Sequence, residues 1–143
     1  MSPDDVSRVQ ASFQAVKPIA AEAAALFYDR LFATAPETRA LFKSDMPEQG
    51  RKLMAALSLV VAGLDRMETI LPAASALAKR HVPWGVVPAH YPLVGAALLW
   101  TLEQGLGESW TPELAASWAK AYAALSDFMI AEAYGAAKAE AAE

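Results

Sequence analysis

The two histidines of this 143-residue chain, His81 and His90, are its most versatile candidates for chemistry. Cysteine is absent, which excludes disulfides, thiolate metal sites and thiol nucleophiles. His81 closes an apolar stripe at helical spacing, and Pro83 and Gly85 end that helix directly afterwards. His90 begins the next apolar pattern, beyond Pro88. Because these helix breakers separate the two imidazoles, a shared zinc site is a weak hypothesis, and His81 is the stronger candidate for a single metal ligand.

Four polar residues lie in register with apolar helical faces: Tyr28, Gln49, His81 and Glu132. Each has an ordinary explanation: a tyrosine bonded to a carbonyl, a glutamine at a helix start, a core histidine and a solvated glutamate. Burying an unpaired polar group costs about 1–3 kcal/mol in mutational data. Several such groups around one core therefore indicate a shared polar partner, which a metal-bearing cofactor would supply. One axial histidine in a helical pocket is enough to hold a haem iron.

The composition excludes several other classes of function. Glycine-rich nucleotide motifs, the serine-hydrolase elbow and the zinc-protease motif are absent. The net charge of −4 and the pI near 5.2 provide no basic footprint for nucleic acid or for anionic lipid. The longest nearly apolar run, from Leu53 to Leu64, is far shorter than the about 20 residues of a membrane span. The N-terminus lacks a secretory signal, so we expect a soluble, cytoplasmic protein.

The elements that must position these residues are all predicted to be helices. Ser2 begins the first helix as a cap, with Pro3 in the first turn and acidic residues behind it. Proline, acid and glycine signals mark the other boundaries. We expect further helices from Pro18 to about Thr34, up to about Phe42, from Asp45 to Leu64, from the break at Asp65 to His81, from His90 to about Gly105, and from Thr111 onward. This pattern predicts one all-α domain, 1–143, of six to eight helices, with a frayed tail over 136–143.

Three segments carry a family resemblance: "LFYDRLFATAPETRALF", "EQGRKLM" and "KRHVPWGVVPAHYPLVGAALLWTLEQGLG". In order and spacing, they resemble the globin family, and more narrowly single-domain bacterial globins and the globin domain of flavohaemoglobins. The resemblance covers nearly the whole chain. It implies a globin fold around a pocket for haem b, with O2, NO and CO as ligands.

On the distal side, the resemblance implies roles for four residues. Tyr28, in "LFYDRLF", matches the tyrosine of the second helix that faces bound ligand, and Gln49 matches the distal polar residue. Leu53, one helical turn beyond Gln49, matches the apolar residue over the iron. Phe42, in "ALFK", matches the phenylalanine that packs on the haem.

On the proximal side, His81 matches the iron ligand, and Tyr91 and Glu132 match a tyrosine and a glutamate that brace it. His90 is expected to remain at the surface. Tyr28, Gln49, Tyr91 and Glu132 are thus the expected catalytic residues. The expected haem contacts are Phe42, Lys52, Leu53, Leu57, Leu77, Arg80, His81, Val86, Tyr91, Val94 and Leu98.

Two features depart from the family pattern. Pro83 and Trp84 follow the ligand position, where relatives have small or polar residues, so we expect a stiffened corner or a reshaped haem edge. The sequence also contains no flavin and nicotinamide reductase domain, so turnover would require an external reductase.

The resemblance implies a haem protein that binds O2 and converts nitric oxide to nitrate, with peroxidase-like chemistry as a side activity. An oxygen carrier or gas-sensing binding module is the main alternative. A haem-free structural protein is a third hypothesis, opposed by the presence of both His81 and Phe42. The sequence leaves the oligomeric state open.

Overall fold

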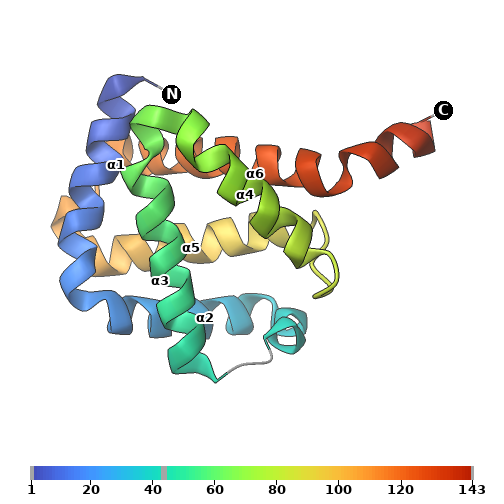
Figure 1. Cartoon of the computed structure of the whole chain (residues 1–143). Coiled ribbons are helices and arrows are strands. Elements are labelled where there is room, and N and C mark those ends of the chain that lie inside the picture. Colours follow the sequence, from blue (N-terminus) through green and yellow to red (C-terminus); the bar gives the residue numbers. More distant parts are fainter. Residues whose placement is uncertain (1, 43–44, 143) are drawn as a thin grey trace.

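The computed structural model describes residues 2–42 and 45–142, with side chains described through Tyr134, and it is built from helices (Figure 1). These residues contain no strand, so the predicted all-α class is confirmed, and the number of α-helices is within the predicted six to eight. The six α-helices are α1 (Pro3–Val16), α2 (Ala20–Thr34), α3 (Met46–Ala62), α4 (Met67–His81), α5 (His90–Leu106) and α6 (Pro112–Ala142). The 3-10 segments are η1 (Lys17–Ile19), η2 (Pro36–Leu41), η3 (Leu64–Arg66) and η4 (Gly107–Ser109).

The helices form two crossing sets around one core. Helices α2, α5 and α6 run side by side across the molecule, and α1 and α3 cross them (Figure 1). Helix α4 packs on α6 and carries His81 at its last position. Val9, Phe13 and Leu31 are almost completely buried in this core, and Trp118 donates a hydrogen bond through Nε1 to Ser12 Oγ at 2.8 Å. The end of α4 is therefore held against a fixed framework.

The helix boundaries follow the capping residues. The side chain of Asp45 accepts a hydrogen bond from the backbone N–H of Glu48 and caps α3. The hydroxyl of Thr111 accepts one from the N–H of Leu114 at the start of α6. Between α3 and α4, Gly63 lies so close to Ile70 that an added Cβ would meet its Cγ2 at 2.2 Å. The expected break at Asp65 is the single 3-10 turn η3. Helix α6 continues to Ala142, so the fraying predicted for 136–143 stays a prediction.

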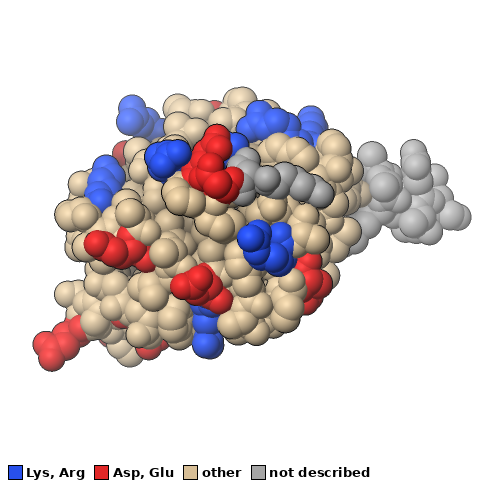
Figure 2. Space-filling model, turned by 90° about the horizontal axis from the view of Figure 1, so that it is seen from below, with Lys and Arg blue, Asp and Glu red and all other residues tan. Residues whose placement is uncertain are grey.

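The surface carries charges of both signs. Figure 2 shows the face seen from below in Figure 1, where acidic and basic side chains are interspersed. None of the helices in the described part of the chain combines the length and the apolar character needed to cross a membrane.

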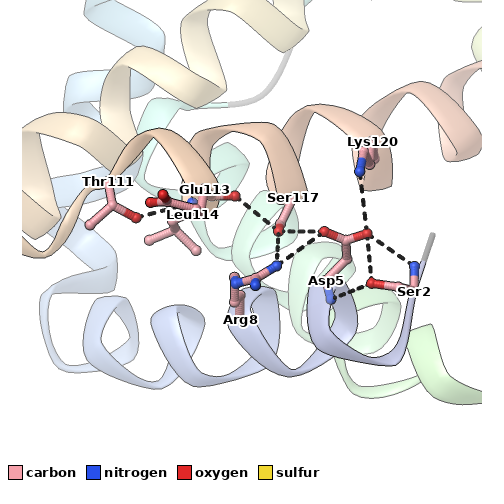
Figure 3. Close-up of polar contacts among 8 residues, drawn as sticks. All are labelled: Ser2, Asp5, Arg8, Thr111, Glu113, Leu114, Ser117 and Lys120. Carbon is pink, nitrogen blue, oxygen red and sulfur yellow. Dashed lines mark hydrogen bonds and ion pairs between the residues drawn. The ribbon is translucent and has the colours of Figure 1, made fainter.

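A buried carboxylate joins the start of α1 to α6 (Figure 3). Asp5 accepts hydrogen bonds from the backbone N–H and hydroxyl of Ser2, and from Ser117 Oγ at 2.7 Å. Lys120 and Arg8 lie within 3.5 Å of its oxygens. The hydrogen bonds, above all the one from the Ser2 N–H, hold the pKa of Asp5 well below its ordinary value of 3.8.

We expect Asp5→Asn to lower the free energy of unfolding at neutral pH, because the amide cannot replace a carboxylate that accepts all these contacts. Because the pKa of this carboxyl is lower in the folded than in the unfolded protein, the ionised carboxylate stabilises the fold at pH values above the unfolded pKa of about 3.9. This contribution declines as the pH falls below that value. The difference between wild type and variant should therefore shrink below about pH 4. Urea unfolding from pH 7 to pH 3 measures it. Asp4→Asn, the same change at an exposed neighbour, should have little effect; equal effects would contradict this role.

Candidate functional site

Tyr28 is the central polar residue of the predicted distal side. It lies on α2, only 6% exposed, and its O–H donates to the backbone carbonyl of Gln49 in the first turn of α3 at 3.2 Å. Burial raises the pKa of Tyr28 to about 12, so the phenol remains a hydrogen-bond donor throughout the physiological range. The bond joins the two helices that provide the predicted distal residues.

An aromatic cluster surrounds Tyr28 and fixes its ring. Phe27 meets it edge-on at 4.9 Å between ring centroids, and Phe42 does so at 5.2 Å. Phe32 stacks on Tyr28 and also contacts Phe42. Edge-to-face and offset-stacked rings at such separations attract one another through their quadrupoles. Phe42, which follows η2, is therefore brought beside Tyr28.

Helix α3 contributes the remaining distal residues. Gln49 is half-buried, and Leu53 and Leu57 follow on the same face, packed against the cluster that contains Tyr28. Lys52 is exposed, with its Nζ 3.8 Å from a carboxylate oxygen of Glu48. The structure thus places the apolar side chains of this helix inward and leaves the ammonium of Lys52 in an exposed ion pair.

His81 and Tyr91 form the centre of the predicted proximal side. His81 Nδ1 lies 3.4 Å from Tyr91 Oη, which places the last residue of α4 against the first turn of α5. His81 is half-buried, and burial, followed by the charge of Arg80, lowers the pKa of its imidazole. The ring is consequently neutral at pH 7, the form that binds metals. Because Nδ1 faces Tyr91, Nε2 is the ring nitrogen suited to a metal.

His90 has a structural role at the start of α5. Its Nδ1 accepts the backbone N–H of Val87 at 3.1 Å, which closes the end of the loop between α4 and α5. The two histidines therefore belong to different local structures, although both flank the same loop.

The structure does not bring Glu132 to Tyr91. Glu132 is exposed on α6 and accepts a hydrogen bond from Ser75 Oγ of α4 at 2.7 Å. Two tyrosines of α6 hold the proximal side instead: the Tyr122 O–H donates to the backbone carbonyl of Tyr91, and that of Tyr134 to the carbonyl of Val86. Sequence reasoning missed both contacts. The signal for Tyr122 was its helical spacing from the apolar residues Trp118 and Leu125, while Tyr134 offered none.

Gly95→Ala should disturb this arrangement, because an added Cβ would lie 2.6 Å from Cε2 of the Tyr122 ring. Tyr122 is fixed by its bond to Tyr91, so we expect a loss of about 1–3 kcal/mol of unfolding free energy, typical of overpacking. Urea titration measures the loss. Gly105→Ala on the same helix meets only Ile19 Cδ1 at 3.4 Å and should be neutral or stabilising. The prediction fails if both variants behave alike.

Comparison with known proteins identifies the family of this chain. The family model described as Globin matches residues 25–129, which include both sides of the site. The chain belongs to the globin family. This confirms the resemblance found in the sequence.

Individual relatives place this globin more narrowly. A flavohemoprotein of Bordetella parapertussis is 33% identical over 133 residues, covering 91% of this chain and 33% of the relative. A flavohemoprotein of Bacillus subtilis is 32% identical over 107 residues, covering 73% of this chain and 27% of the relative. This globin thus spans about a quarter to a third of the flavohemoproteins. An uncharacterized globin-like protein of Aquifex aeolicus is 32% identical over 130 residues, covering 91% of this chain and 92% of the relative.

The predicted haem contacts of this globin fall into two apolar clusters. Phe42, Leu53, Leu57, Val94 and Leu98 belong to the large core cluster around Tyr28. Leu77, Val86 and Tyr91 belong to a second cluster, formed mainly by α4 and α6. Most of these side chains are half-buried, and His81 sits beside the second cluster.

This donor set fits a haem. A flat, largely apolar group with a metal at its centre would contact half-buried aliphatic side chains from both clusters and take one imidazole ligand. The described residues contain no group of three or more His, Asp or Glu side chains able to hold a metal ion by themselves. Arg80 and Lys52 are exposed, where cations would suit the carboxylates of a porphyrin edge. A single imidazole in half-buried apolar surroundings is a donor set that a haem could use, with His81 as the candidate ligand.

Two small apolar cavities adjoin the distal residues, and both are lined by Leu57 and Leu98. Their volumes are about 10 and 30 Å³. Both are far smaller than the roughly 300–1,000 Å³ of pockets for cofactor-sized molecules.

Proposed function

We propose that this globin binds haem b through His81, binds O2 on the opposite side beside Tyr28, and converts nitric oxide to nitrate with electrons from an external reductase. The observation that carries the proposal is the pairing of a neutral, tyrosine-braced His81 with a buried phenol donor on α2. Flavohemoprotein relatives support haem and a reductase partner. The haem would supply the iron at which the diatomic gases react.

The chain's own residues would divide the work between the two sides. With Nε2 on the metal, Nδ1–H of His81 would donate to Tyr91 Oη, fixing the ring and raising its basicity. Tyr28 would turn its O–H from the Gln49 carbonyl toward the negatively polarised ligand, with the Gln49 amide as a second donor. Leu53, Leu57 and Phe42 would exclude water from this space.

Oxygen carriage without turnover is the second candidate, and the position of Glu132 favours it. Tyr91 remains a neutral phenol, because burial raises its pKa, and Glu132 is paired with Ser75 rather than with Tyr91. A neutral acceptor gives the imidazole less anionic character than a carboxylate would. An imidazole braced by a neutral phenol suits reversible binding of O2 more than activation of O2 for reaction.

One experiment separates the two candidates. The oxygenated protein is mixed with nitric oxide in a stopped-flow instrument, and nitrate and ferric haem are measured. Nitrate that keeps forming over many equivalents per haem when a reductant is supplied supports dioxygenation, whereas a single equivalent shows no turnover. Slow reaction, or none, would leave oxygen carriage, and the failure of purified protein to take up haem would overturn both.

A further inference from the structure

Exposed apolar side chains gather in the loop between α4 and α5. Val82, Trp84 and Val87 are 43%, 52% and 46% exposed, and they make up most of the large exposed apolar residues in the described part of the chain. The loop lies at the edge of the molecule (Figure 1). We call residues 82–89 the 82–89 surface. Large apolar side chains that gather at an exposed site are a candidate for contact with a partner.

The 82–89 surface is held in one shape. The backbone N–H of Val86 donates to the His81 carbonyl at 3.1 Å, and Tyr134 of α6 donates to the Val86 carbonyl. Gly85 provides the turn with a positive φ of 92°, and His90 closes the loop at its end. The exposed side chains are therefore presented by a fixed backbone, which lowers the ordering cost of binding a partner.

The surroundings of the 82–89 surface indicate the partner's chemistry. Residues 82–89 carry no charge, but Lys79 and Arg80 in the last turn of α4 are exposed and basic. This basic turn contrasts with the net charge of −4 of the chain. Trp84 reaches from the surface to 5.5 Å from the His81 ring, measured between centroids. An acidic partner with an apolar centre would thus be brought beside the proximal histidine.

We propose that the 82–89 surface, with Lys79 at its rim, docks an electron-donor protein whose contact face is apolar at its centre and acidic at its edge. The inference rests on the proposed function. The donor loses one electron and ferric haem becomes ferrous, with no bond made or broken and no proton required. Trp84 packs beside the His81 ring, with the centroids 5.5 Å apart, and so joins this surface to the predicted proximal site.

The test uses reduced flavodoxin, a small acidic flavoprotein, as the donor, and stopped-flow reduction of the ferric protein under CO. Val87→Asp places a negative charge in the surface, where it repels the acidic donor, and it should slow reduction by roughly tenfold or more. Leu59→Asp is the matched control, since Leu59 is a 54% exposed apolar residue near the end of α3. It should react within about twofold of wild type. Dithionite, which needs no docking, should reduce all three proteins equally.

A second pair of variants tests the role of the basic charge at the rim of the 82–89 surface. Lys79→Glu should slow reduction by flavodoxin and flatten its dependence on ionic strength, because an attractive pair is lost. Arg66→Glu makes the same change of charge at the last residue of η3, directly before α4, and should alter neither the rate nor its dependence on ionic strength. NMR titration of the labelled CO form with oxidised flavodoxin should perturb amides of residues 82–89.

Equal slowing by Val87→Asp and Leu59→Asp, or amide perturbation confined to other helices, would overturn the docking proposal. A second outcome would also overturn the docking proposal. If sedimentation shows a dimer that Val87→Asp converts to monomer, and reduction by flavodoxin is unchanged, the surface binds a second copy of the chain. These readouts need only ferric haem and CO. A failure to form nitrate therefore bears on the proposed function and not on the surface.

Discussion

His81→Ala is expected to abolish the axial ligation of haem iron, whereas His90→Ala should leave it intact. The structure separates the two imidazoles by role: His81 Nδ1 faces Tyr91 and leaves Nε2 for a metal, while His90 Nδ1 accepts the Val87 amide. Only a neutral imidazole can ligate iron, and the lowered pKa of His81 means that protons begin to compete below the ordinary value of about 6.5.

The measurement is the visible spectrum of purified protein in the ferric, ferrous and CO-bound forms. Wild type and His90→Ala should show an intense Soret band with a histidine-ligated CO spectrum, and His81→Ala should lose that spectrum and most of its haem. Added imidazole should restore ligation in His81→Ala, which distinguishes a lost ligand from a lost fold. The assignment would be wrong if His90→Ala lost haem and His81→Ala kept it.

The apolar framework could be predicted from sequence because helical periodicity is a local property. The boundaries at Asp45, Asp65 and Thr111 came from caps and breakers, and the structure realises them as N-caps or a 3-10 turn. The three segments that contain Tyr28, Gln49 and His81 then resembled the globin family in their order and spacing, and the family match confirms that resemblance.

The proximal contacts of α6 could not be predicted in the same way. They depend on the rotation and axial position of α6 relative to α4 and α5, which no local pattern fixes. Glu132 was expected beside Tyr91, yet its carboxylate accepts from Ser75, and the phenols of Tyr122 and Tyr134 bond to backbone carbonyls of neighbouring segments. A backbone acceptor leaves no trace in the side-chain pattern, so these partners are visible only in three dimensions.

Tyr28→Phe is expected to raise the rate of O2 dissociation by about ten- to a hundredfold, since one hydrogen bond to a charged acceptor is worth roughly 1.5–3 kcal/mol. The buried ring should stay in place, because Phe27, Phe32 and Phe42 pack on its carbon skeleton rather than on its hydroxyl. The lost O–H donates to the Gln49 carbonyl at 3.2 Å, a long bond that the hydroxyl can exchange for a ligand.

Three further measurements distinguish the loss of this hydrogen-bond donor from other causes of faster O2 dissociation. CO polarises less than O2, so its dissociation should change much less in Tyr28→Phe; equal changes would indicate a reshaped pocket rather than a lost donor. In wild type, the rate should stay flat from pH 6 to 9, because the raised Tyr28 pKa of about 12 keeps the phenol protonated across that range. Gln49→Leu, which removes the second donor, should have the smaller effect, since Tyr28 is buried and Gln49 only half-buried. A larger effect of Gln49→Leu would transfer the main stabilising role from α2 to α3.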